Sequence, residues 1–298
     1  MRRRSTGAVV ALALGLGCAW TAIARAGDAP ATAAVSPAKK VDLPPVKVPM
    51  VVAAVLVQYP LMIVLPVVLG LWLRKRLRVP IWVWFAGMAS FVGSQVIHLP
   101  LNFLLGFGPL KGAPLPATAV VLGLSAGLCE ECARYLVMRL LQRRQQTGWA
   151  AAMLLGAGHG GVEAILFGDL AALALLSMLL LPLAGEKAAL PEVQAAAWSY
   201  WTNAWYTPLY AGVERVGAMM AHLGMSVLVM RAVTRKNLFW LAAAIGAHAL
   251  MDGLILSLKA ARIGDLWLEG VVLVIGAALL AVALLLRERP PPAAGEPA

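Results

Sequence analysis

Charged residues are scarce in this chain of 298 residues: 13% are Asp, Glu, Lys or Arg, whereas 61% are hydrophobic. So few polar side chains could not cover the surface of a soluble domain of this size, which excludes a soluble globular protein. Cysteine is scarce as well. Cys18 lies in the first apolar run, and Cys129 and Cys132 lie three positions apart in a later one, so there is no basis for a disulfide framework.

Long apolar runs take the place of the missing polar residues. Several of them reach the roughly 20 residues that a helix needs to cross a bilayer. We therefore predict an all-α, polytopic transmembrane helix bundle with about seven spans after an N-terminal signal peptide. The fourth span is too long for one straight helix, which predicts a kink, a tilt or an interfacial continuation. The predicted spans are 50–72, 81–105, 116–141, 149–182, 208–230, 238–258 and 266–286.

The N-terminal 26 residues have the pattern of a secretory signal peptide. A basic start precedes a short apolar run and the small-residue site around Ala24 and Ala26. An uncleaved first anchor is the alternative. We expect residues 27–49, which are rich in Pro and Ala, to form an exposed linker. The predicted domains are then the signal peptide 1–26, this linker, a transmembrane domain 50–287 and a disordered cytoplasmic tail 288–298.

Basic residues lie mainly in one set of loops, which predicts the orientation. One side carries Arg74, Lys75, Arg76, Arg78, Arg143, Arg144, Arg231, Arg235, Lys236, Arg287 and Arg289, and the other carries Lys111, Lys187, Lys259 and Arg262. Because positive loops stay in the cytoplasm, we expect a cell (inner) membrane protein with its mature N-terminus outside and its C-terminus in the cytoplasm. The aromatic segment AAAWSYWTNAWYTP before the fifth span predicts an interfacial segment or a substrate-contacting lip.

Ionisable side chains gather inside the predicted spans, where they are costly and normally face the protein interior. Glu131, His159, His222 and His248 each lie 9–12 residues from the basic-loop end of their span. At 1.5 Å per residue this places all four roughly 14–18 Å deep, near the middle of a hydrocarbon core about 30 Å thick. We therefore predict that several helices bring polar groups together at one level. The candidate site residues are Glu130, Glu131, Arg134, His159, Glu163, His222, His248 and Asp252.

Several of these residues form i, i+4 pairs that share a helix face: Glu130 with Arg134, His159 with Glu163, His222 with Ser226, and His248 with Asp252. Small residues surround them, as in GAGHGG and GLSAGL, and allow membrane helices to pack closely. Each pair has a structural alternative, such as an intrahelical ion pair or an interhelical hydrogen bond. For His98, in SQVIHLPLN, and for Glu214 with Arg215, we expect a supporting or packing role.

Such a cluster fits hydrolysis by activated water. A buried carboxylate near neutral histidines can act as a general base, and imidazoles can stabilise an oxyanion. The same residues could hold a divalent metal such as zinc. The sequence has no HExxH motif, and its residue pattern leaves the metal-free glutamate mechanism and the metallohydrolase both open. A peptide bond of a membrane-associated protein is the expected target, and nucleic acid is not an expected partner.

The motifs EECARY, GAGHGGVEA, ERVGAMMAHLGMS and AHALMD, in this order, resemble those of the YhfC family over about residues 50–285. These are intramembrane proteases grouped with the CAAX-prenyl-protease and bacteriocin-processing (CPBP) enzymes. The resemblance implies that Glu130 or Glu131 activates water and that Arg134 holds this motif in place. It also implies that His159, His222 and His248 line the site and that Asp252 orients His248. The wider group has FxxxH and HxxxN where this chain has GHGGVE and HALMD.

Two other functions remain open on the sequence. Buried Glu, His and Asp residues also serve as proton relays in proton-coupled transporters, although no half-chain repeat is evident here. An inactive protease-like scaffold is the third reading, but it predicts the loss of a core polar residue, and none is missing. The sequence specifies neither the substrate nor the oligomeric state.

Overall fold

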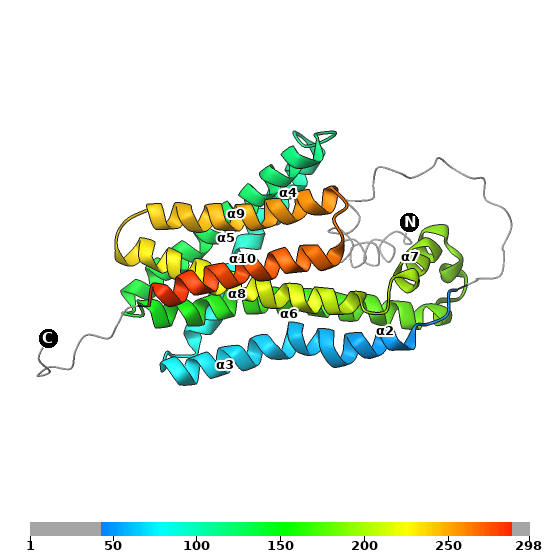
Figure 1. Ribbon diagram of the computed structural model, residues 1–298, viewed down its shortest axis with the longest axis horizontal. Helices are drawn as coiled ribbons and strands as arrows, with labels where there is room; N and C mark the ends of the chain where they lie inside the picture. The colour runs from blue at the N-terminus through cyan, green and yellow to red at the C-terminus, as the bar shows by residue number, and fades with distance from the viewer. Residues whose placement is uncertain (1–42, 288–298) are drawn as a thin grey trace, which may run out of the picture. The chain divides into compact units, whose positions relative to one another are not determined.

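The computed structural model describes residues 43–287 (Figure 1). The predicted signal peptide, most of the predicted linker and the predicted tail lie outside this range. The described residues form helices and no strand. In order these are α2 (Val48–Ala53), η1 (Ala54–Gln58), η2 (Pro60–Val64), α3 (Leu65–Leu77), α4 (Trp82–Phe107), α5 (Leu115–Arg143), α6 (Trp149–Leu180), η3 (Leu181–Ala189), α7 (Pro191–Thr202), α8 (Thr207–Thr234), α9 (Phe239–Ala260) and α10 (Asp265–Leu285).

Among the described residues, seven helical stretches are long and apolar enough to cross a membrane. Their bounds agree with the seven predicted spans within a few residues, which confirms a polytopic all-α membrane protein. The fourth stretch continues from α6 into the 3₁₀ segment η3, where Gly185 breaks the helical path with φ 55°. A positive φ is accessible to glycine at little cost. The predicted orientation of the termini stays a prediction.

The first span contains a widened stretch around Pro60. Both flanking segments, η1 and η2, are π-helical. Proline has no backbone N–H, and its ring collides with the carbonyl group four residues earlier, so a regular α-helical turn cannot form there. Longer i→i+5 turns on both sides accommodate the ring.

By itself, one compact unit consists of the described residues up to Val64 together with Ile165–Val213. Its core packs Met50 and Ala54 against Leu175, Met178 and Trp201. The Lys47 ammonium donates hydrogen bonds to the backbone oxygens of Asn203 (2.6 Å) and Thr202 (3.3 Å). These bonds satisfy carbonyl groups at the end of α7, which helix ends otherwise leave without partners.

The second unit comprises Leu65–Ala164 and the described residues from Glu214 onward. Within it α9 follows α5 closely, and α10 runs back beside α9 (Figure 1). The α5–α9 contact depends on glycine: a Cβ at Gly127 would lie 2.7 Å from the Ile245 carbonyl oxygen, and one at Gly123 would lie 2.6 Å from that of Ala249. Because side chains do not separate these two helices, α9 brings its polar residues within reach of α5.

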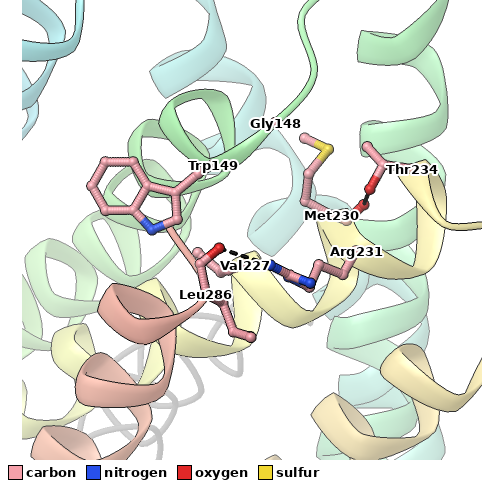
Figure 2. A pocket seen from close by; sticks show the side chains of 7 residues that line it. All are labelled: Gly148, Trp149, Val227, Met230, Arg231, Thr234 and Leu286. Atoms are coloured by element: carbon pink, nitrogen blue, oxygen red, sulfur yellow. Dashed lines mark hydrogen bonds between the residues drawn. The ribbon is translucent and has the colours of Figure 1, made fainter. Parts of the chain in front are cut away.

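A small pocket lies at the end of this unit where α6 begins and α8 ends (Figure 2). Its volume of about 10 Å³ holds no more than one water molecule. The Trp149 indole donates to the Ala283 carbonyl oxygen (2.7 Å), and the Arg231 guanidinium donates to that of Leu286 (2.9 Å). Arg287 lies over the Trp149 ring at 5.1 Å. Two of the basic residues that indicate orientation therefore also fasten the end of α10 to the bundle.

Candidate active site

The predicted site residues meet within the second unit, carried by four helices. Helix α5 provides Glu130, Glu131 and Arg134, α6 provides His159 and Glu163, α8 provides His222, and α9 provides His248 and Asp252. Glu131, Arg134 and His159 have 0% of their surface exposed. The predicted convergence of polar groups is therefore present in the structure, whereas their catalytic roles stay predictions.

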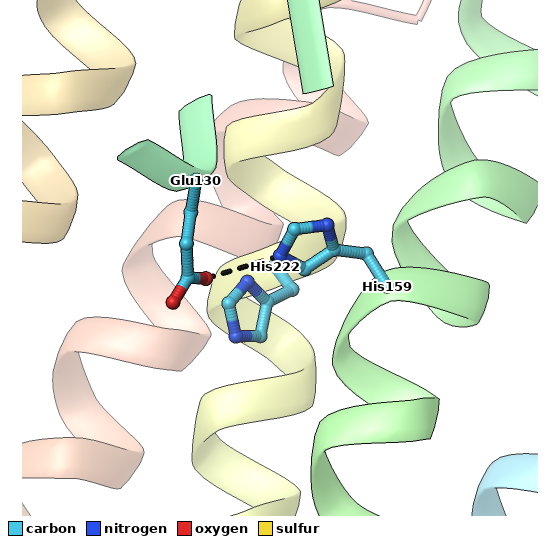
Figure 3. A group of neighbouring side chains, drawn as sticks. All are labelled: Glu130, His159 and His222. Atoms are coloured by element: carbon cyan, nitrogen blue, oxygen red, sulfur yellow. Dashed lines mark hydrogen bonds and ion pairs between the residues drawn. The ribbon is translucent and has the colours of Figure 1, made fainter. Parts of the chain in front are cut away.

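Three imidazole rings form the centre of this cluster. The ring centroids of His159 and His222 lie 5.0 Å apart, and those of His222 and His248 lie 5.6 Å apart. Glu130, His159 and His222 point toward one another (Figure 3), and each offers one ligand atom within 4.8 Å of the others. By distance alone, this trio could hold a metal ion.

The hydrogen bonds of His159 tie its imidazole to α4 on one side and to α5 on the other. Ser90 Oγ lies 2.8 Å from His159 Nδ1 and 2.7 Å from the Gly87 carbonyl oxygen, and His159 Nε2 lies 3.1 Å from Glu130 Oε2. A hydroxyl group has one hydrogen, which leaves two arrangements. If Ser90 donates to Gly87, Nδ1–H donates to Ser90, and a proton or another cation lies between Nε2 and Glu130. If Ser90 donates to Nδ1, Nε2–H donates to Glu130.

His222 lies between two ion pairs. Arg134 donates to both oxygens of Glu131 (2.8 and 2.5 Å) and to His222 Nδ1 (2.9 Å). Because a guanidinium can only donate, Nδ1 must accept, and His222 Nε2–H donates to Glu163 Oε2 at 2.6 Å. Arg215 bonds the other Glu163 oxygen at 2.6 Å. His222 is thus neutral, and both of its nitrogens are already engaged.

His248 has the opposite arrangement. Its Nδ1–H donates to Glu131 Oε1 at 2.8 Å. Its Nε2 lies 3.8 Å from Glu130 Oε2 and 3.6 Å from Asp252 Oδ2, both beyond normal hydrogen-bond length. His248 therefore directs a nitrogen that no close hydrogen bond engages toward Glu130 and Asp252.

The structure changes three of the predicted pairings. Arg134 pairs with Glu131, its i−3 neighbour, and not with Glu130. Glu163 lies against His222 and Arg215 instead of His159. The Ser226 hydroxyl has no hydrogen-bond partner among the described residues. Arg134 has two acidic neighbours on its own helix face, and its contact with His222 of α8 fixes the choice between them. Glu163 instead meets a better-placed partner on another helix, His222 of α8.

Helix α4 contributes residues that the sequence prediction missed. Ser90 holds His159, and Gln95 Nε2 donates to Glu130 Oε1 at 3.2 Å. His98, expected in a supporting role, lies 3.9 Å from that oxygen and bonds Gln95 instead. The sequence contains a pattern that could have indicated these residues. Polar residues recur at helical spacing in this apolar span: Ser90, Ser94, Gln95, His98 and Asn102.

Ser125 lies in GLSAG, which matches the G-x-S-x-G pattern of serine hydrolases. That pattern requires a sharp turn between a strand and a helix. Ser125 instead lies in the middle of α5, and its hydroxyl donates to Asn102 Oδ1 at 2.7 Å, with the Leu122 carbonyl oxygen 2.8 Å away. The structural context for a serine nucleophile is therefore missing.

Two comparisons with known proteins give matches for this chain. A family model described as YhfC intramembrane metalloprotease matches residues 61–275, a range that includes every residue of the cluster. The protein named "Uncharacterized membrane protein YhfC" of Bacillus subtilis (strain 168) is 31% identical over 200 residues. The alignment covers 63% of this chain and 77% of that protein. No solved structure matches.

Proposed function

We propose, on the premise that this chain belongs to the YhfC intramembrane metalloprotease family, that it hydrolyses a peptide bond of a membrane-associated protein at Glu130. The observation that carries this proposal is the contact between Glu130 Oε2 and His159 Nε2, 3.1 Å apart and shielded from solvent. A buried carboxylate held against an imidazole nitrogen is typical of a functional site.

The donor types suit a divalent metal. A carboxylate with two histidines is a ligand set of catalytic zinc sites. His248 donates Nδ1–H to Glu131, and with a metal on Nε2 His159 would donate Nδ1–H to Ser90, as histidines that bind metals usually do. Their Nε2 atoms lie 3.1 and 3.8 Å from Glu130 Oε2. Ligand atoms around tetrahedral zinc lie about 3.3 Å apart, given bonds of about 2.0–2.1 Å.

His222 fits the metal poorly, although it lies within the trio defined by distance. To bind a cation it would need a lone pair on Nε2, which carries the hydrogen shared with Glu163. Moving that hydrogen to Nδ1 would set it against the Arg134 guanidinium, which can only donate. We therefore assign the ligands as Glu130, His159 and His248, and His222 as a neutral link between the ion pairs of Arg134 and Arg215.

When bound, a divalent cation would polarise the scissile carbonyl group and make water easier to deprotonate. The chain itself supplies the proton acceptor. Asp252 lies beside His248, and its side chain keeps 23% of its surface exposed. Apart from His248, it has no ion-pair or hydrogen-bond partner among the residues that the structure describes. We assign Asp252 Oδ2 to take the proton from the attacking water and return it to the leaving amine.

A metal-free reaction is the second candidate, and the same 3.1 Å contact supports it. A proton shared between Glu130 Oε2 and His159 Nε2 would satisfy both atoms without a metal. Glu130 would then be the general base that activates water, and His159 would hold the proton. Glu131 suits this role less well because Arg134 and His248 already occupy both of its oxygens.

A peptide-cleavage experiment tests the proposal. Purified protein in liposomes is incubated with labelled transmembrane and membrane-proximal peptides, with a chelator and then with zinc restored. The variants are Glu130→Gln, His159→Ala and Asp252→Asn, with Glu192→Gln on α7 as the matched control. New peptide termini are read by mass spectrometry.

We expect cleavage by the wild type and the control, loss in the three site variants, and reversible loss with the chelator. Cleavage that resists the chelator but needs Glu130 assigns the metal-free route. Undiminished cleavage by Glu130→Gln would refute the site. Glu130-dependent movement of protons or solutes without cleavage would assign a transporter instead, and binding of the peptides without cleavage would assign a scaffold.

A further inference from the structure

Glu130 has a partner outside the proposed reaction, the Gln95 amide on α4. We propose that Gln95 is a positioning residue: it fixes the orientation of the Glu130 carboxylate and is itself held by a chain through His98 and Asn102 to Ser125. This inference rests on the proposed function only in taking Glu130 as the reacting centre.

The direction of every hydrogen bond between Ser125 and Glu130 follows from the Glu130 carboxylate. An ionised carboxylate only accepts, so Gln95 must turn its NH₂ toward Glu130 Oε1, at 3.2 Å. Gln95 Oε1 then faces His98 Nδ1, at 3.3 Å, and must accept from it. His98 Nε2 is left with a lone pair.

The hydrogen bonds between His98 and Ser125 complete this pattern. Asn102 Nδ2 donates to His98 Nε2 at 2.9 Å, which turns Asn102 Oδ1 toward the Ser125 hydroxyl at 2.7 Å. Four bonds therefore point the same way, from Ser125 to Glu130. Reversing one amide would place two acceptors or two donors against each other, so the chain keeps Gln95 in its donating orientation.

Gln95, and not His98, is the residue that contacts the carboxylate. His98 Nδ1 lies 3.9 Å from Glu130 Oε1, too far for a hydrogen bond. The second hydrogen of the Gln95 NH₂ reaches Ser94 Oγ at 3.1 Å, and Ser94 donates to the Phe91 carbonyl oxygen at 2.6 Å. Gln95 is thus anchored on both sides.

The consequence concerns which Glu130 oxygen reacts. Since Oε1 is held by Gln95, Oε2 is the oxygen directed at His159, 3.1 Å away, and at His248, 3.8 Å away. Without Gln95 the carboxylate could rotate about its last bond and exchange the two oxygens. Gln95 thereby presents one defined oxygen to the two histidines.

Two measurements on the purified full-length protein test this inference. The first is zinc affinity, measured by competition with a chelator. The second is the infrared band of the Glu130 carboxyl group, assigned by its loss in Glu130→Gln. The variants are Gln95→Leu and Asn102→Leu. The matched control is Gln142→Leu, on the same helix as Glu130 but about 18 Å further along it at 1.5 Å per residue.

We expect Gln95→Leu to weaken zinc binding by about 10- to 100-fold, as the loss of a partner that orients a metal ligand typically does. It should also shift the Glu130 band. Asn102→Leu should produce a smaller shift of the same sign, and it replaces Gln95→Leu if that variant cannot be purified. Gln142→Leu should change neither quantity.

An unshifted band together with unchanged zinc affinity in Gln95→Leu would overturn the inference. So would an equal effect of Gln142→Leu. Failure of the proposed function is seen separately, because a wild type that neither binds zinc nor cleaves peptide refutes that function. The infrared band still tests the role of Gln95 in such a protein.

Discussion

The ion pair between Glu131 and Arg134 gives the most direct test of the site, because its effect on stability can be measured without knowing the substrate. Both side chains have 0% exposed surface, and Arg134 makes two bonds to Glu131 and one to His222. Removing one partner of a buried pair leaves an uncompensated charge. We therefore expect Arg134→Met and Glu131→Gln each to lower the free energy of unfolding by about 3–5 kcal/mol.

The double variant should be less damaged than either single variant. When Glu131→Gln is combined with Arg134→Met, no charge remains unpaired, and the amide oxygen introduced at position 131 can still accept from His248 Nδ1–H. The main loss is the donor to His222 Nδ1, an unsatisfied buried group that costs about 1–3 kcal/mol. The coupling free energy between the two positions should therefore be at least about 3 kcal/mol in favour of the double variant.

Unfolding by SDS in mixed micelles, followed by circular dichroism, gives these free energies. Arg139→Met is the control, since Arg139 is exposed on the same helix and has no ion pair among the described residues; it should change stability by no more than about 0.5 kcal/mol. Single variants within about 1 kcal/mol of the wild type would indicate a solvated pair. Additive losses would show that the two residues do not interact. Either result would refute the buried pair.

Three further predictions concern the ligand assignment and the packing that supports it. Ser90→Ala should weaken zinc binding by about 10- to 100-fold in the same competition assay, because it removes the partner that fixes the imidazole orientation. His248→Ala should abolish zinc binding, whereas His222→Asn should retain it at equal stoichiometry; the reverse result would favour the distance-based trio. Gly87→Ala should destabilise the protein by about 1–3 kcal/mol in SDS unfolding because its Cβ would meet the backbone of α6. Gly93→Ala, with nothing within 4 Å of its Cβ, is the matched control, and equal losses would contradict the close helix contact.

The seven spans could be predicted because the bilayer imposes a strong and local rule. Each crossing helix must bury its own backbone polar groups and present about 20 apolar residues. The gathering of polar side chains was predictable for a related reason. Groups that hydrocarbon cannot solvate must find one another, and their depth follows from counting residues along each helix.

The pairing within the cluster was less predictable. The sequence indicated Glu130 with Arg134 and His159 with Glu163, whereas the structure has Glu131 with Arg134 and His222 with Glu163. Positions three and four residues apart both lie on one helix face, so spacing alone does not rank them. The choice depends on which side chain a neighbouring helix meets.

The sequence by itself thus determined the helices, their number in the described region and the level at which their polar groups lie. Only the tertiary structure decided which partner each histidine nitrogen meets, and that Gln95 and Ser90 of α4 hold Glu130 and His159. The physical reason is range. Hydropathy and helical rise act along the chain, but a hydrogen bond depends on distances of a few tenths of an ångström between helices. Close backbone contacts, such as that of Gly127 with Ile245, set those distances.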